Sequence, residues 1–156
     1  MKNITLSVSK EKVYDAVAEI TAYIAVKMPS EEDIYSRVST KESDRTFLDR
    51  MWVEACGVAT YRLRRFITDV SEHYETNSDT FRTELTVPSS FLRALTDSVN
   101  SALHSFFVYY IVAKWFKYTN REEVSSYMFE AEDYIEDAIR KINYQQTPRR
   151  RKVSPF

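Results

Sequence analysis

Residues 39–70, with the sequence STKESDRTFLDRMWVEACGVATYRLRRFITDV, carry the most regular pattern in the chain. Seven apolar residues recur at spacings of four and three: Leu48, Trp52, Ala55, Ala59, Leu63, Phe66 and Val70. This period places all seven on one face of an α-helix. Ser39 and Glu42 have the spacing of a capping box, in which each side chain satisfies a backbone N–H at the helix start. The pattern therefore predicts one long central helix over residues 40–74.

Three further segments have helical periodicity, and their expected ranges are residues 10–27, 90–117 and 121–143. The first helix should end before Pro29, because proline interrupts a helix. Asn120 and Glu123 resemble a second capping box, which would open the last helix. The stripe of the 90–117 helix consists of Leu92, Leu95, Val99, Leu103, Phe106, Tyr110 and Ala113.

Two short segments alternate between apolar and polar residues, as half-buried strands do. They cover residues 3–8 and 80–87. Because a single strand leaves its backbone groups unpaired, we expect the two to pair with each other or with a neighbouring subunit. The predicted fold is mainly α, with a four-helix bundle-like body over residues 1–147, two short β-strands and an extended C-terminal arm over residues 148–156.

The composition excludes several classes of protein. The chain has 156 residues, the size of one domain, and its only glycine is Gly57. Phosphate-binding loops and tight hairpins depend on glycine, so Rossmann and P-loop motifs are absent. The most apolar stretch, residues 106–113, is far shorter than the roughly 20 residues of a membrane span. The N-terminus has no apolar core of a signal peptide, and we expect a protein that is made in the cytoplasm and has no membrane partner.

No set of side chains indicates catalysis, a cofactor or a metal site, and we predict a protein that is not an enzyme. Cys56 lies beside the apolar stripe and is interpreted as a buried small hydrophobe rather than a nucleophile. Five acids crowd the last helix: Glu130, Glu132, Asp133, Glu136 and Asp137. The Glu-x-x-His pairs of a di-iron bundle are missing, so these acids are expected on a solvent face or against a basic neighbour.

Two groups of residues are predicted at a subunit interface. Arg62, Arg64 and Arg65 form a basic cluster that we expect to pair with the acids of the last helix or of another subunit. Tyr109, Phe116 and Tyr118 belong to aromatic residues that surround the 90–117 helix on several faces. A body of this size does not readily bury every side of that helix, and aromatic residues are enriched at interfaces, which predicts an oligomer.

The C-terminal arm is strongly basic. Its candidate docking residues are Pro148, Arg149, Arg150, Arg151, Lys152 and Phe156. Without these four bases, 18 basic residues remain against 23 acidic ones, so the body carries about −5. Because the arm is positive and the body negative, the arm could bind an acidic surface, another subunit or nucleic acid. Docking into a partner, with Phe156 as an apolar anchor, stands beside two alternatives, a solubilising end and a nucleic-acid contact.

The order of these elements resembles a known family. A short strand leads into Lys12-Val13-Tyr14, Thr21-Ala22-Tyr23 and Lys27-Met28, and the long helix opens with Asp44-Arg45. That helix carries Leu48, Arg50, Trp52 and Glu54-Ala55-Cys56, and it is followed by Ala102-Leu103-His104 through Trp115 and finally by Pro148 and the basic arm. In this pattern, which spans nearly the whole chain, the sequence is similar to the small helical head-to-tail connector (adaptor) proteins of tailed bacteriophages, including the crAss-like phages of Bacteroidetes.

This resemblance implies a structural virion protein at the head–tail junction. Such proteins form a ring, typically twelvefold, beneath the portal protein and pass DNA through its centre. The resemblance also implies that residues 148–156 dock on the portal, that the long helices pack between neighbouring subunits and that a tail protein binds the other side. An acidic body would suit a channel wall, because a lining of like charge does not retain DNA.

Two other classes stay open. One is a DNA-handling packaging protein similar to a small terminase subunit, which would use Arg62, Arg64, Arg65 and the arm, and which salt-dependent duplex binding would reveal. The other is a non-viral helical interaction module, which would stay monomeric at every concentration.

Overall fold

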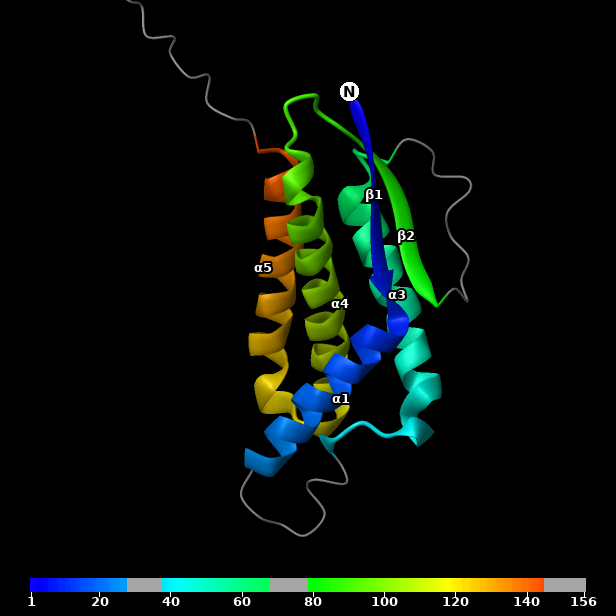
Figure 1. The fold of residues 1–156 in the computed structure, drawn as a ribbon. Coiled ribbons are helices and arrows are strands. Elements are labelled where there is room, and N and C mark those ends of the chain that lie inside the picture. The colour runs from blue at the N-terminus through cyan, green and yellow to red at the C-terminus, as the bar shows by residue number, and fades with distance from the viewer. Residues whose placement is uncertain (28–37, 68–78, 145–156) are drawn as a thin grey trace, which may run out of the picture.

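The computed structural model describes residues 1–27, 38–67 and 79–144, and these ranges form a mainly helical fold with four helices and one two-stranded sheet (Figure 1). The elements are β1 (Lys2–Ser9), α1 (Lys10–Lys27), α3 (Arg45–Leu63), β2 (Thr80–Val87), α4 (Thr96–Thr119) and α5 (Val124–Ile142). Short 3-10 turns precede the last three helices, at Glu42–Asp44, Arg93–Leu95 and Arg121–Glu123. The predicted arm, residues 148–156, lies outside the described residues.

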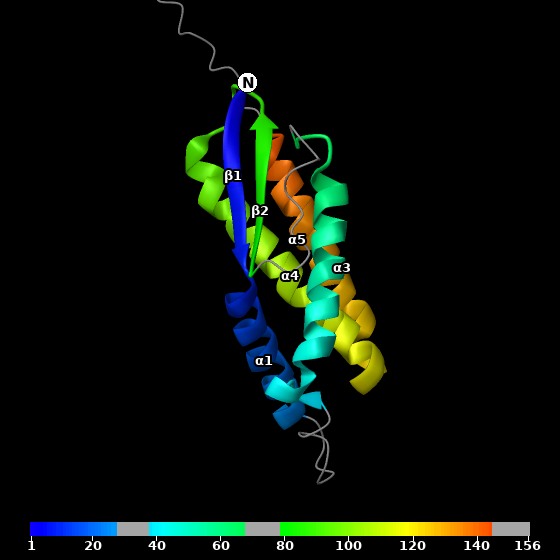
Figure 2. The ribbon, with the colours of Figure 1, turned by 90° about the vertical axis from the view of Figure 1, so that its right-hand side faces the viewer.

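The central element is α4, with the other elements packed around it. α5 returns antiparallel along α4, and α3 lies on another side of it (Figures 1 and 2). α1 crosses α4 obliquely, and β1 contacts the N-terminal part of the same helix. Eleven residues of α4 are buried: Val99, Ala102, Leu103, Phe106, Phe107, Val108, Tyr110, Ile111, Val112, Ala113 and Phe116. The prediction that residues 40–74 form the long central helix is therefore wrong, because α4 is both longer and more deeply enclosed.

The two predicted strands pair with each other, antiparallel and in a single register from Lys2↔Val87 to Ser9↔Thr80. Residues at every second position point inward and are buried: Ile4, Leu6, Val8, Phe81, Thr83, Leu85 and Val87. β1 continues into α1 without a loop, so the direction of the strand sets the direction of the helix (Figure 2). The Ser7 N–H donates to Asn100 Oδ1 at 3.0 Å and ties the edge of β1 to α4.

α3 is shorter than the sequence pattern predicts. The helix ends at Leu63, and the chain then turns so that the carbonyl of Phe66 accepts the Thr86 N–H at 2.7 Å. Ile67 forms a bridge with Leu85, so this segment lies against the outer edge of β2. Phe66 has the right spacing for the helical stripe but belongs to the sheet side, and the rest of the predicted helix, residues 68–74, lies outside the described residues.

The starts of the helices also differ from prediction by a few residues. The Lys41 N–H donates to Asp44 Oδ2 at 2.8 Å, so the cap before α3 lies two residues after the predicted Ser39–Glu42 box. α5 begins at Val124 rather than 121, because the 3-10 turn Arg121–Glu123 occupies the first positions of its pattern. α4 begins at Thr96 rather than near 90, because Leu92 is extended and the 3-10 turn Arg93–Leu95 follows it. The predicted start of the first helix at Lys10 is confirmed, and the helix is described as far as Lys27, with residues 28–37 outside the described residues.

Candidate interaction surface

A partly buried polar cluster joins the start of α1 to α3. Lys10, whose side chain is only 11% exposed, places its Nζ 3.1 Å from Asp49 Oδ1. The same carboxylate oxygen accepts the Tyr14 hydroxyl at 2.6 Å. The guanidinium of Arg45 lies 4.9 Å from the centre of the Tyr14 ring and also pairs with Glu11. The cluster links the first turns of α1 to the first turns of α3, and nothing in the sequence pattern indicates that its members are paired.

These contacts perturb the acid–base behaviour of both partners of the hydrogen bond. Burial, together with donation to the Asp49 carboxylate, raises the pKa of Tyr14 above its ordinary value. Burial alone would raise the pKa of Asp49, but the hydrogen bonds from Tyr14 and Lys10 outweigh it and leave that pKa lowered. Tyr14 therefore stays protonated and Asp49 stays ionised near neutral pH, which is the arrangement of a structural contact rather than of a proton-transfer pair.

A second polar junction joins α3 to α4. Glu54 Oε1 accepts the Tyr110 hydroxyl at 2.6 Å and lies 2.8 Å from Lys114 Nζ. The hydrogen bonds from Lys114 and Tyr110 hold the pKa of Glu54 below its ordinary value. Both junctions use charged groups of α3 to attach it to its neighbours.

The three arginines of the predicted basic cluster have two different environments: Arg62 forms ion pairs within the chain, whereas Arg64 and Arg65 lie at the surface. Arg62 Nη1 lies 2.6 Å from Glu132 Oε2, and its Nη2 lies 3.9 Å from Glu136 Oε1. This contact confirms the expected pairing of Arg62 with acids of the last helix, within one chain. Arg64 and Arg65 are exposed and lie over the rings of Tyr61 and Phe66, at 3.9 and 4.7 Å from the ring centres.

The three predicted aromatic interface residues have three different environments. Tyr109 is half-buried between Tyr127 and Tyr134 of α5, with ring centres 5.6 and 5.3 Å away. Phe116 is fully buried, so its predicted place at a subunit interface is corrected: four elements surround α4 and cover the face on which it lies. Tyr118 remains 71% exposed and makes an edge contact with the ring of Phe47.

The cysteine lies in the core as predicted. Cys56 is buried on α3, and burial raises the pKa of its thiol to about 12. A thiol with this pKa is almost entirely protonated at neutral pH and is a poor nucleophile. Within the three described ranges, no group of three or more His, Cys, Asp or Glu side chains is arranged to hold a metal ion.

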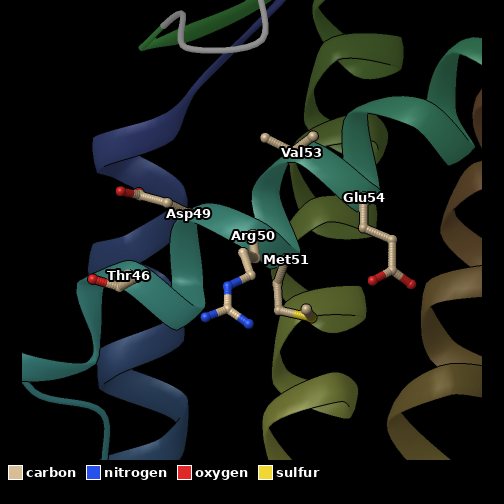
Figure 3. Close-up of a pocket in the computed structure, with 6 residues that line it drawn as sticks. All are labelled: Thr46, Asp49, Arg50, Met51, Val53 and Glu54. Atoms are coloured by element: carbon tan, nitrogen blue, oxygen red, sulfur yellow. The ribbon is translucent and has the colours of Figure 1, made fainter.

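An open hollow of about 610 Å³ lies along the outer side of α3 (Figure 3). The described residues that line it are Thr46, Asp49, Arg50, Met51, Val53 and Glu54. Asp49 and Glu54 are already engaged with Lys10 and Lys114, as described above. The groups left for a ligand are of mixed character, and they do not indicate a particular chemistry.

The outward side of α5 carries several exposed acidic residues. We define the α5 outer face as Phe129, Glu130, Asp133, Asp137 and Arg140, which follow at helical spacing on the side away from the buried Ala131, Ile135, Ala138 and Ile142. Glu130, Asp133 and Asp137 line a shallow hollow of about 460 Å³ together with Tyr134 and Arg140. Phe129 and Tyr144 are 68% and 52% exposed. The expected solvent position of the acids is confirmed, whereas the exposure of Phe129 could not be predicted from the apolar stripe.

The acids of this face differ in their pairing. Asp137 Oδ2 lies 2.6 Å from Lys141 Nζ, and the neighbouring Glu132 and Glu136 contact Arg62. Among residues 1–27, 38–67 and 79–144, neither Glu130 nor Asp133 has a cationic partner. The hollow therefore combines the carboxylates of Glu130 and Asp133 with the guanidinium of Arg140, and the exposed ring of Phe129 lies beside Glu130.

No family model, curated protein or solved structure matches this chain. In the part of the chain that the structure describes, none of the helices has the length and apolar content needed to cross a membrane.

Proposed function

We propose that this chain is a structural virion protein, a head-to-tail connector that forms a ring beneath a phage portal protein and surrounds a channel for DNA. The observation that carries the proposal is the polarised charge: an acidic outer face on α5 in a body of about −5, followed by an arm with four consecutive bases. The resemblance of the element order to connector proteins supports the same assignment.

Each part of the chain has a role in this proposal. The arm, residues 148–156, docks on the portal, with Arg149 to Lys152 as electrostatic guides and Phe156 as the apolar anchor. An acidic surface repels the phosphate backbone, so a ring that turns this surface inward lets DNA slide without binding it. Arg64, Arg65 and Tyr118 are exposed and serve as the candidate contacts between subunits, whereas Arg62 already serves the contact between α3 and α5.

The first experiment is negative-stain electron microscopy of the purified full chain, with native mass spectrometry on the same sample. Closed rings of about a dozen copies are the expected result, either alone or after addition of the portal protein of the same phage. A chain that stays monomeric at high concentration and with the portal present contradicts the connector function and favours a helical interaction module.

A DNA-handling function is the second candidate, because Arg64 and Arg65 are exposed and, in the described part of the chain, are not engaged in ion pairs. A filter-binding assay with duplex DNA at 50 and 200 mM salt distinguishes the two. Phosphate contacts release counterions, so a DNA-handling protein would bind tightly and lose affinity steeply with salt. A connector is expected to bind weakly at both salt concentrations.

A further inference from the structure

α3 and α5 lie on different sides of the central helix α4, and each turns one face outward. Figure 1 shows α5 on the left of α4 and α3 on its right, and both helices run from the lower end of the bundle to the upper end. We define the α3 outer face as four exposed residues that follow at helical spacing: Arg50, Gly57, Tyr61 and Arg64. The α5 outer face, defined above, lies on the other side of the subunit.

The α3 outer face has a cation at each end and a gap between them. The guanidinium of Arg64 lies over the ring of Tyr61, 3.9 Å from its centre, which holds the charge close to that ring. In the part of the chain that the structure describes, neither Arg64 nor Arg50 forms an ion pair. Gly57, between them, has no side chain and leaves a notch in the exposed surface of the helix.

The α5 outer face has the opposite character at its lower half. Phe129 is 68% exposed, and Asp133, one turn higher, has no cationic partner among the described residues. Glu122 is exposed in the 3-10 turn that leads into α5. Arg140 belongs to the same face but lies about 10 Å above Asp133 along the helix. An exposed ring therefore stands between two acids, as the notch of α3 stands between two cations.

The ring and the notch lie at the same height on the bundle. Arg62 contacts both Glu132 and Glu136, so it is level with the position midway between them, residue 134. Gly57 stands five residues before Arg62, and Phe129 stands five residues before that position. Because both helices run in the same direction and rise about 1.5 Å per residue, Gly57 and Phe129 are level with each other.

The lower charges are level in the same way. Arg50 stands seven residues before Gly57, and Glu122 stands seven residues before Phe129. The 3-10 turn that holds Glu122 rises slightly more per residue than an α-helix, which shifts this acid by only about 1 Å.

The upper charges match as well. Tyr61, whose ring carries the Arg64 guanidinium, stands four residues after Gly57, and Asp133 stands four residues after Phe129. Read upward, the α3 outer face presents a cation, a notch and a cation, and the α5 outer face presents an acid, a ring and an acid at the same heights.

We propose that the α3 outer face of one subunit binds the α5 outer face of the next, with Phe129 seated in the notch at Gly57. The inference rests on the proposed connector function, because subunits related by rotation about an axis along the bundle meet at equal heights. Arg50 and Arg64 then pair with Glu122 and Asp133 of the next subunit. A contact between two different surfaces of the same protein continues from copy to copy and closes into a ring when the rotation divides the circle.

Gly57 itself favours a contact at this point. Glycine destabilises the middle of a helix relative to alanine, and an exposed position in a helix ordinarily accepts a larger residue. In the described part of the chain Gly57 adopts no positive φ that would require glycine. A Cβ atom at this position would stand where the Phe129 ring of the next subunit is placed.

This contact leaves acids free for the channel. Successive residues of a helix are about 100° apart, so Glu130 and Asp137 lie about 80–100° round α5 from Phe129. These two carboxylates therefore turn away from the contact at Phe129, and they keep the acidic surface that the connector function assigns to the channel wall.

The first test fills the notch. Gly57→Leu should leave the helical circular dichroism of the chain intact, since leucine is a better helix former than glycine. It should abolish the rings in negative-stain electron microscopy of the full chain, at concentrations at which the unmodified chain is fully assembled. The matched control, Glu19→Leu, places the same side chain at an exposed site of α1 and should leave the rings unchanged.

The second test exchanges the charges. Arg64→Glu and Asp133→Arg should each abolish the rings, because each places like charges opposite each other in the contact. The double variant Arg64→Glu with Asp133→Arg restores the opposite signs and should restore the rings. A role of either residue inside its own subunit would not produce this rescue.

The third test measures proximity in the assembled ring with a short bismaleimide. Arg50→Cys with Ser125→Cys places thiols at similar heights on the two faces and should give a ladder of covalently linked subunits on a denaturing gel. The matched pair Arg50→Cys with Asn143→Cys should give none, because residue 143 lies on the same side of α5 but about 27 Å higher. Cys56 stays in place because its buried thiol does not react.

The outcomes separate this contact from the connector function. Rings that form with Gly57→Leu, rings that give no ladder with the first cysteine pair, or a charge exchange without rescue overturn the inference and leave the connector function standing. A chain that forms no rings, alone or with the portal protein, overturns both.

Discussion

The Lys10–Asp49 pair predicts an asymmetry between two single substitutions. Asp49→Ala removes the carboxylate that serves both the Lys10 amine, at 3.1 Å, and the Tyr14 hydroxyl, at 2.6 Å. What remains near Lys10 is Asp79, 3.9 Å away with a side chain 82% exposed, which is a weak partner. Lys10→Met instead removes the buried charge and keeps an apolar side chain of similar length. The Asp49 carboxylate then retains its hydrogen bond from Tyr14.

The expected magnitudes follow from burial. Removing one partner of a fully buried ion pair costs about 3–5 kcal/mol, because the other charge is left buried and unpaired. The side chain of Asp49 is 44% exposed, so water reaches this site and the cost falls to about 2 kcal/mol. The lost acceptor of Tyr14 adds about 1 kcal/mol. We therefore expect Asp49→Ala to lower the free energy of unfolding by about 2–3 kcal/mol and Lys10→Met to change it by less than about 1 kcal/mol.

Equilibrium urea unfolding, followed by circular dichroism, measures both values, and Asp49→Asn serves as a control of similar volume. For a chain of this length the Asp49→Ala effect corresponds to a fall in Tm of roughly 4–12 °C. The reasoning is refuted if the two substitutions cost the same, or if Asp49→Ala is neutral.

Three further predictions test other parts of the structure. Because the folded pKa values of Asp49 and Glu54 lie below their unfolded values, the stability that they provide is complete above about pH 4 and is lost as the pH falls through the folded values. Urea midpoints between pH 7 and pH 2 should show this loss, and the double variant Asp49→Asn with Glu54→Gln should reduce it. Cys56 should not react with a thiol reagent at pH 8 until urea unfolds the chain, and fast labelling of the native protein would contradict its burial. Phe116→Ala should cost about 3–5 kcal/mol, whereas Tyr118→Ala should cost less than about 1 kcal/mol and should act only on assembly, as shown by urea unfolding together with native mass spectrometry.

The helices and strands that could be predicted are those whose own residues show a regular apolar period. α1, α5 and the two strands have a clear period, and their limits are within three residues of prediction. The end of α3 could not be predicted in the same way, since Phe66 stands three residues after Leu63 and suits a helix as well as a turn. The helix ends here because the Phe66 carbonyl accepts a hydrogen bond from the Thr86 N–H, which belongs to a strand twenty residues further along the chain.

The residues of the candidate interaction surface also differ in how far the sequence predicts their positions. The solvent position of the α5 acids follows from their spacing, and the pairing of Arg62 follows from charge. The burial of Phe116 does not, because it depends on how many elements surround α4 rather than on its own pattern. Lys10 is a comparable case: a lysine in the first turn of a helix is usually solvated, and this one is buried because β1 leads into α1 without a loop and brings it against Asp49.

The register of the sheet has a consequence for synthesis on the ribosome. Lys2 pairs with Val87, so 85 residues separate the synthesis of this residue from that of its partner. At about 5–20 residues per second, this delay is roughly 4–17 s. During that time the apolar side of β1, with Ile4, Leu6 and Val8, has neither its strand partner nor α4 to cover it. The α4–α5 hairpin joins neighbouring segments and forms without such a delay. A growing chain therefore exposes the apolar side of β1 until β2 and α4 have been made.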